Sequence, residues 1–240
     1  MKQGEQQEDA TEMPDIKGDV TFENVTFAYE EGKDVLKNVS FTVKAGESVA
    51  LVGPTGAGKS TIVNLISRFY NVGQGRVLID GQDIAKVTLR SLRSQMGIML
   101  QDSFIFSGTI EDNIRYGKLD ATTEEIVKAS KTVCAHDFIN RFTDGYQTEV
   151  KERGSLLSQG QKQLISFART LLSDPAILVL DEATSSIDVQ TEKALQQGLN
   201  AMLQGRTSFI IAHRLSTIKN CDKIMYIDQG GIMECGSHEE

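Results

Sequence analysis

The sequence has few cysteines and histidines, no long apolar run and no excess of positive charge, and each shortage excludes a class of protein. Cys134, Cys221 and Cys235 show no C-x-x-C spacing and the three histidines are widely spread, which argues against a disulfide framework and a zinc site and fits a reducing compartment. No apolar run approaches the roughly 18–20 residues that span a bilayer, and residues 1–19 lack the apolar stretch of a signal peptide. The fragment is therefore expected to be soluble by itself.

The charge balance is acidic, with 25 Lys and Arg against 33 Asp and Glu and a net charge of −8. This balance does not favour nucleic acid or an anionic membrane surface as a partner, so any phosphate binding must be local. The chain has 240 residues, 40% of them apolar, which is enough for one large domain or two small lobes with a core.

The most informative stretch is the glycine-rich segment from Gly53 to Thr61, which follows the apolar run 48–52. It fits the pattern G-x-x-x-x-G-K-[ST], in which backbone N–H groups surround a phosphate, Lys59 reaches the β- and γ-phosphates and the Ser60 hydroxyl can bind Mg²⁺. An apolar stripe at helical spacing follows, formed by Ile62, Leu65, Ile66 and Phe69. The positive end of that helix adds to the anion site. The alternative is a glycine-rich turn that binds nothing. Such a turn would not require three glycines followed by a lysine, so we favour the phosphate-binding loop.

The first half of the remaining chain predicts an antiparallel layer and a helical insertion. Residues 1–17 are rich in Gln and Glu without periodicity, so we expect a disordered tail or linker remnant. The segments 20–27 and 39–43, with a turn at 30–33 between them, predict an N-terminal antiparallel β layer. From about 102 to 173 strand signals give way to helices opened by Thr or Asp caps, which predicts an inserted α-helical subdomain.

Apolar strand-like runs lie on both sides of this insertion, at 48–52, 75–81, 96–100, 176–180, 207–211 and 224–227. Helical stretches separate the last three runs, and the alternation predicts an α/β fold with a mostly parallel sheet and no internal repeat. Ligands in such folds bind beyond the carboxyl ends of the strands. Three groups are expected at such ends: the glycine-rich loop, the pair Asp181-Glu182, and His213.

These polar groups have a chemistry in common with the loop. Asp181 can hold Mg²⁺ beside the phosphates, and Glu182 can orient or deprotonate an attacking water. Gln101 ends another strand and can reach metal or water through its amide, while His213 can contact a γ-phosphate or the water. Each also has a plain alternative: a solvated strand end for the two acids, an ordinary polar loop residue for Gln101 and a structural histidine for His213.

A second anion site is predicted at Ser158, which precedes a long helical pattern and is expected to cap it. The free N–H groups and positive end of that helix favour an anion, although one nucleotide does not need two such sites. The residues themselves leave a plain N-cap as the alternative.

Taken together and in this order, GPTGAGKST, Gln101, LSQGQ at 157–161, ILVLDEATSSID at 177–188 and His213 resemble the nucleotide-binding domain of an ATP-binding cassette (ABC) transporter. The resemblance covers about residues 18–238. It implies a P-loop NTPase core with an N-terminal antiparallel β layer and an inserted helical subdomain. The implied ABC domain covers residues 18–240, its core 18–101 and 174–240, and its helical subdomain about 102–173.

The resemblance assigns a role to each of these residues. The residues expected to bind ATP are Tyr29, which stacks on adenine, and Gly53, Thr55, Gly56, Ala57, Gly58, Lys59, Ser60, Thr61 and Asp181. Those expected to bind Mg²⁺ are Ser60, Gln101 and Asp181. Glu182 is expected to be the general base, His213 to contact the γ-phosphate, and Gln101 to link the catalytic site to a membrane domain.

In this family a second cassette completes each site, and the residues expected to do so in trans are Ser158, Gly160, Gln161 and Asp188. The resemblance therefore implies a head-to-tail dimer, homomeric or heteromeric, that sandwiches two ATP molecules. Segments 107–114 and 148–154 are similar to those of the exporter branch, whose members move drugs, lipids or peptides. We thus expect an ATP-hydrolysing motor domain of an exporter, at the cytoplasmic face of the membrane, with a transmembrane domain on the same full-length chain and no nucleic-acid partner.

Two departures from the family pattern are present. Gln159 replaces the usual glycine of the LSQGQ segment, and Ser185 to Asp188 reads SSID instead of SALD. The first leaves the Ser158 and Gly160 contacts intact, so we expect function to survive. The chain also stops at Glu240, which indicates an excised domain or a separately encoded subunit. We expect an excised domain, because exporter-type cassettes usually follow a membrane domain on the same chain.

Three alternatives compete with this interpretation. A regulatory cassette of an asymmetric heterodimeric transporter would hold ATP without hydrolysing it, and Glu182 and His213 argue against that. A soluble cassette ATPase acting on nucleic acid or ribosomes would carry basic surfaces, which the net charge of −8 opposes. A small-molecule P-loop kinase would lack the LSQGQ segment.

Overall fold

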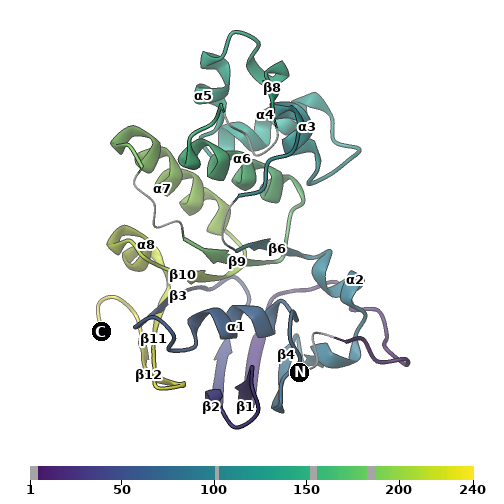
Figure 1. Cartoon of the computed structure of the whole chain (residues 1–240), viewed down its shortest axis with the longest axis vertical. Helices are drawn as coiled ribbons and strands as arrows, with labels where there is room; N and C mark the ends of the chain where they lie inside the picture. Colours follow the sequence, from purple (N-terminus) through teal and green to yellow (C-terminus); the bar gives the residue numbers. More distant parts are fainter. Residues whose placement is uncertain (1–4, 101–102, 152–155, 183–186) are drawn as a thin grey trace. The chain divides into compact units, whose positions relative to one another are not determined.

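The computed structural model describes residues 5–100, 103–151, 156–182 and 187–240 (Figure 1). Its contacts divide the chain into two compact units. The core unit contains the described residues up to Ile98, 176–182 and 205–240, and the helical unit contains the described residues of 99–175 and 183–204. Within the described residues, no helix is both long enough and apolar enough to cross a membrane. The predicted α/β fold class is confirmed.

A six-stranded sheet forms the centre of the core unit, in the order β12-β11-β3-β10-β9-β6. Its strands are β3 (Ser48–Val52), β6 (Met96–Met99), β9 (Ile177–Asp181), β10 (Thr207–Ile211), β11 (Lys223–Asp228) and β12 (Gly231–Gly236). β10 pairs in parallel with both β3 and β9, and β11 pairs in parallel with β3. Every residue of β10 is buried, as expected of a continuous apolar run in a parallel sheet. β12 is antiparallel to β11 and was not among the predicted strands.

The predicted N-terminal β layer is the second sheet of the core unit, in the order β2-β1-β4-β5. Its strands are β1 (Val20–Ala28), β2 (Asp34–Val43), β4 (Gln74–Ile79) and β5 (Gln82–Asp83). β1 pairs antiparallel with β2 and β4, and its buried apolar side chains alternate with less buried ones. Phe22 and Phe41, opposite each other in the register, stack with ring centroids 4.5 Å apart. The antiparallel layer is confirmed, and the strand expected near 75–81 belongs to it.

The helices of the core unit are short. They are α1 (Lys59–Ile66), α2 (Leu89–Arg93), α8 (Leu215–Asn220) and the 3₁₀ turn η1 (Ile84–Lys86). In α1 the apolar stripe that the spacing predicted is buried through Ile62, Leu65 and Ile66, whereas Phe69 lies beyond the helix end and is exposed.

The segment before β1 differs from the disordered tail expected over residues 1–17. Its described part, residues 5–17, is bound to several parts of the core unit, among them Arg68, Asp80 and α2. Met13 donates its backbone N–H to Ser91 Oγ (2.7 Å), and Ile16 donates its own to Gln95 Oε1 (2.8 Å). The side chains of Met13 and Ile16 are 6% and 9% exposed. The segment is ordered because two of its side chains are buried and its backbone finds hydrogen-bond partners in α2 and in the residue Gln95 beyond it.

The helical unit contains the predicted insertion. Its elements are β7 (Gly108–Thr109), α3 (Ile110–Arg115), α4 (Thr123–Thr132), α5 (His136–Arg141), η2 (Gly145–Gln147), β8 (Glu149–Val150), α6 (Gln159–Leu172) and α7 (Val189–Leu203). α6 packs against α3, α4 and α7 and is the centre of the unit (Figure 1). α7 was expected in the core because it follows residue 173. It groups with the helical unit because its buried residues Leu195, Gly198 and Leu199 pack there, with Gly198 against Val133.

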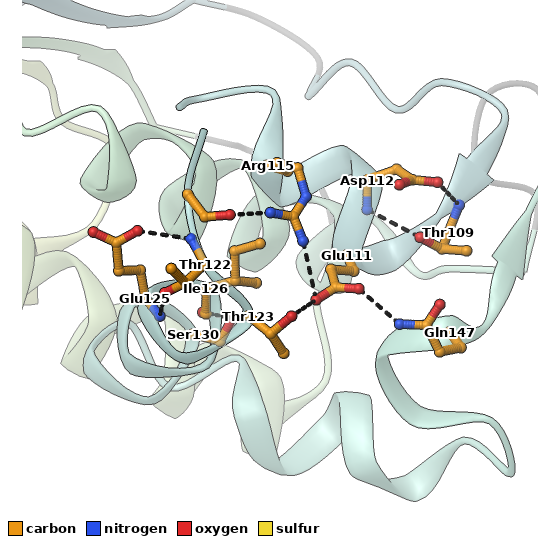
Figure 2. A network of polar contacts seen from close by, with 11 residues as sticks. Thr109, Glu111, Asp112, Arg115, Thr122, Thr123, Glu125, Ile126, Ser130 and Gln147 are labelled. Atoms are coloured by element: carbon orange, nitrogen blue, oxygen red, sulfur yellow. Dashed lines mark hydrogen bonds and ion pairs between the residues drawn. The ribbon is translucent and has the colours of Figure 1, made fainter. Parts of the chain in front are cut away.

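A polar network links α3, α4 and η2 of the helical unit, as Figure 2 shows. Glu111 on α3 accepts hydrogen bonds from the Thr123 hydroxyl of α4 (2.9 Å) and the Gln147 amide of η2 (2.7 Å), and it pairs with Arg115 at 3.3 Å. Thr109 and Thr122 cap α3 and α4 through capping boxes, in which each side chain accepts the N–H of the third helical residue. The helix starts were predictable because a capping box is a local pattern.

Candidate functional site

Three predicted site segments meet at one edge of the parallel sheet. β10 lies between β3 and β9, and its last residue Ile211 pairs with Leu51 on one side and Asp181 on the other. The carboxyl ends of these strands are therefore adjacent. The glycine-rich loop follows β3, His213 follows β10, and Glu182 follows β9.

The geometry of the glycine-rich loop requires its glycines. Gly53, Gly56 and Gly58 have φ values of 142°, 79° and 112°, a region that other residues rarely adopt. A Cβ on Gly53 would lie 2.0 Å from the Ile227 carbonyl oxygen, and one on Gly58 would lie 2.7 Å from Leu36 Cδ2. A side chain at Gly53 would clash with backbone, and one at Gly58 would be strained by the positive φ and would displace the Leu36 side chain. The loop backbone is thus held in a curved path at the start of α1, which suits an anion bound by backbone N–H groups.

The lysine of the loop is folded back onto it. Lys59 Nζ donates to the Gly53 carbonyl oxygen at 2.5 Å, so its ammonium already lies over the loop. Ala57 and Thr61 are buried, whereas Thr55 and Ser60 are exposed at the loop surface. An ammonium and a hydroxyl at the mouth of a curved backbone are the groups that phosphate and a hard cation select.

Tyr29, expected to stack on adenine, is fixed by its hydroxyl to α1. The hydroxyl and Thr61 Oγ1 are 3.0 Å apart, and Asn64 Nδ2 donates to the hydroxyl at 3.1 Å. The ring makes edge contacts with Phe27 (4.9 Å) and Tyr70 (5.0 Å). The sequence did not predict the Asn64 contact. The Tyr29 ring therefore lies beside α1, the helix that follows the glycine-rich loop.

Glu182, the expected general base, is turned inward and is 3% exposed. Its Oε2 accepts the backbone N–H groups of His213 (2.8 Å) and Arg214 (3.0 Å). Its Oε1 accepts the Thr217 hydroxyl and lies 3.5 Å from the Arg214 guanidinium. Sequence reasoning missed Arg214 and Thr217, because neither stands in a motif and both reach Glu182 only through the pairing of β9 with β10.

Asp181 and His213 contact each other through their side chains. His213 Nε2 lies 3.3 Å from Asp181 Oδ1, and both side chains are about one third exposed. Among the described residues, no group of three or more His, Cys, Asp or Glu side chains is arranged to hold a metal ion. Mg²⁺ needs fewer protein ligands, since it keeps several waters and binds substrate phosphates. Asp181 and Ser60 fit that requirement, whereas Gln101 lies outside the described residues.

The residues expected to act in trans belong to the helical unit. Ser158 caps α6, as predicted: its hydroxyl accepts the Gln161 N–H (3.2 Å), and Gln161 Oε1 accepts the Ser158 N–H (3.0 Å). Asp188 caps α7 by accepting the Thr191 N–H at 2.9 Å, and the pKa of its carboxyl is lowered by the hydrogen bonds from Thr191. Gly160 is buried where a Cβ would lie 2.4 Å from Thr191 Cγ2.

Comparison with known proteins agrees with this arrangement. The sequence pattern of the ABC transporter family matches residues 36–185. The chain is 52% identical to the ABC transporter ATP-binding protein YfiC of Bacillus subtilis, over 98% of the chain and 39% of that protein. It is 50% identical to the fatty acid ABC transporter ATP-binding/permease protein of Mycobacterium bovis, over 98% of the chain and 37% of that protein.

Among solved structures, an ATP-bound bacterial Atm1-family ABC exporter matches with a TM-score of 0.89 and 48% identity, over 98% of this chain and 41% of that one. The chain thus spans about two fifths of the length of the relatives that it matches. The family pattern covers more than half of the chain. The chain therefore belongs to the ABC transporter family, as a nucleotide-binding domain of the kind found in its exporters.

Proposed function

We propose that this chain binds ATP with Mg²⁺ and hydrolyses it in a head-to-tail dimer, and that the cycle drives export through a membrane domain. The observation that carries the proposal is the convergence of the glycine-rich loop, Asp181, Glu182 and His213 at one edge of the parallel sheet. A phosphate-binding loop next to two carboxylates and an imidazole supplies the groups that phosphoryl transfer to water requires.

Phosphate binding would use the loop backbone and Lys59. The ammonium now donates to the Gly53 carbonyl oxygen, a neutral acceptor. An anionic phosphate oxygen is a stronger acceptor, because charge-assisted hydrogen bonds are about twice as strong as neutral ones. Lys59 would therefore exchange its partner when ATP binds. Ser60 and Asp181 would hold Mg²⁺, which neutralises charge on the phosphate oxygens when bound.

Hydrolysis would use Glu182 as the general base and His213 as the γ-phosphate contact. Glu182 follows the strand that ends beside β10, so its backbone is anchored by the N–H bond to the Ile211 carbonyl at 3.0 Å. General-base catalysis contributes roughly 100- to 10,000-fold in rate. The carboxylate needs an acceptor position facing the attacking water in order to make this contribution.

Dimerisation would use the capped start of α6. Ser158, Gly160 and Gln161 form a first turn whose N–H groups and positive end attract an anion. These residues would contact the ATP held by a partner domain, and Asp188 would lie in the same interface. The partner is a second copy of this chain or a related cassette.

The membrane domain would belong to the same full-length protein. Relatives are ATP-binding/permease proteins in which the chain matches only about two fifths of the length. The chain would then act at the cytoplasmic face of the membrane. Residues beyond this chain would select the cargo.

The test combines turnover and association of the Glu182→Gln variant. ATP affinity should stay near the wild-type value, and ATP turnover should fall by roughly 100-fold or more. Sedimentation of the same variant should give twice the 26.4 kDa mass only with Mg-ATP. Glu239→Gln, at an exposed acid near the chain end, is the matched control and should behave as wild type. Equal turnover in both variants would remove Glu182 from the base role.

A further inference from the structure

The Glu182 carboxylate has no acceptor position to offer in this conformation. A carboxylate has about four lone-pair positions on its two oxygens. Two backbone N–H groups occupy Oε2, while the Thr217 hydroxyl and the Arg214 guanidinium occupy Oε1. The side chain is 2% exposed. With these donors in place and almost no water contact, the carboxylate has no lone pair left to hydrogen-bond an attacking water.

The donors differ in how readily they can leave. The His213 and Arg214 N–H groups belong to the backbone between β10 and α8 and can move only with that backbone. The Thr217 hydroxyl turns about a single side-chain bond, and the Arg214 guanidinium lies at the end of a flexible chain, 3.5 Å from Oε1. Oε1 is therefore the oxygen that can be freed without rearranging the core unit.

We propose that Thr217 is a positioning residue that holds Glu182 in an inward, resting orientation, and that release of Oε1 from Thr217 and Arg214 precedes hydrolysis. The proposal rests on the proposed role of Glu182 as general base. Thr217 is 1% exposed, so water has no access to replace its hydroxyl as a donor. Its contact with a charged acceptor is the strong kind, worth about a factor of ten in an equilibrium.

The test compares Thr217→Val, which keeps the shape and removes the hydroxyl, with Thr217→Ser, which keeps the hydroxyl. Steady-state ATP turnover of the whole chain is measured over a range of ATP and chain concentrations. Thr217→Val should raise kcat up to about tenfold with the KM for ATP unchanged, and Thr217→Ser should match the wild type. Arg214→Gln, which keeps the backbone N–H and removes the guanidinium, should also raise kcat.

The controls separate this proposal from the proposed function. Glu182→Gln and Glu182→Gln with Thr217→Val should both be nearly inactive. If Glu182→Gln keeps its turnover, the general-base role is wrong, whatever Thr217 does. A different result would refute the proposal that Thr217 holds Glu182 in a resting orientation. In that result Glu182→Gln is inactive, Thr217→Ser matches the wild type, and the kcat of Thr217→Val is equal to or lower than that of the wild type. The hydroxyl would then serve the active orientation of Glu182 instead. Circular dichroism shows whether each variant folds. If Thr217→Val does not fold, Arg214→Gln provides the test, and a kcat at or below the wild-type value refutes the proposal.

Discussion

Replacing Gly160 with alanine tests whether this glycine of the LSQGQ segment is required by the packing of the chain itself. Gly160 is helical and buried in the first turn of α6, so alanine meets no backbone strain there. Its new Cβ, however, would lie 2.4 Å from Thr191 Cγ2 and 3.1 Å from Ile187 Cγ2. Contacts of this kind force the start of α7 to shift.

Two opposing effects set the magnitude. Overpacking a buried site costs about 1–3 kcal/mol. Alanine is better than glycine inside a helix by about 0.5–1 kcal/mol. Gly160→Ala should therefore lower the free energy of unfolding by about 1 kcal/mol, the difference between the middle values of the two effects. Thr191→Ser removes the nearest methyl group, so in its background the same alanine should be neutral or slightly stabilising.

Urea unfolding of the wild type, the two single variants and the double variant measures the effect. Gly198→Ala is the matched control, because its Cβ would lie 2.3 Å from the Val133 carbonyl oxygen, a backbone atom that a side-chain change cannot remove. Gly198→Ala should cost more than Gly160→Ala. The Thr191→Ser change should not recover it.

Two results would refute the reasoning. If Gly160→Ala unfolds at the wild-type urea concentration, the close contact is relieved at no cost. If Thr191→Ser fails to restore the double variant, the loss arises elsewhere. If Gly160→Ala is as stable as the wild type but no longer dimerises with Mg-ATP, the glycine is needed only for contact with the ATP of a partner domain.

Three further predictions follow from individual contacts. Asn113→Leu should lower the free energy of unfolding by about 3 kcal/mol, because the fully buried amide of Asn113 accepts the Phe106 N–H and donates to the carbonyls of Phe106 and Thr109, and leucine makes none of these bonds; urea unfolding checks it. The hydrogen bonds from Thr109 lower the pKa of Asp112, so the wild type should be more stable than Asp112→Asn near neutral pH. Urea unfolding from pH 7 to 3 should show this advantage begin to fall below about pH 4, where the carboxyl of the unfolded chain takes up its proton. Lys59→Ala should weaken ATP binding by roughly tenfold or more in a fluorescence titration, and unchanged affinity would count against the phosphate-loop role.

Patterns within one segment were predictable because their physics is local. The loop from Gly53 to Gly58 needs positive φ values, and only glycine adopts them readily. The start of α6 at Ser158 follows from a side chain three residues from its backbone partner. The β11–β12 hairpin carried a local signal that the prediction missed, since Gln229 and Gly230 form its two-residue turn with φ values of 49° and 78°.

Contacts between distant segments were not predictable. Residues 5–17 have the composition of a disordered tail, yet Ser91 of α2 and Gln95 beyond it supply partners for their backbone. The acids at the end of β9 were expected to face a nucleotide, whereas Glu182 turns inward because the backbone after β10 presents two N–H groups to it. Single-sequence patterns do not say which backbone a side chain will meet.

The sequence by itself determined the family, the fold class and the conformation of the glycine-rich loop, because these depend on motif order, hydrophobic period and backbone freedom over a few residues. Only the tertiary structure decided the orientation of Glu182, the donors Arg214 and Thr217 that hold it, and the packing that excludes a side chain from Gly160. These features depend on strand order and helix contact, which join residues far apart in the chain. Burial then fixes them, since a carboxylate removed from water must find its hydrogen-bond donors within the protein.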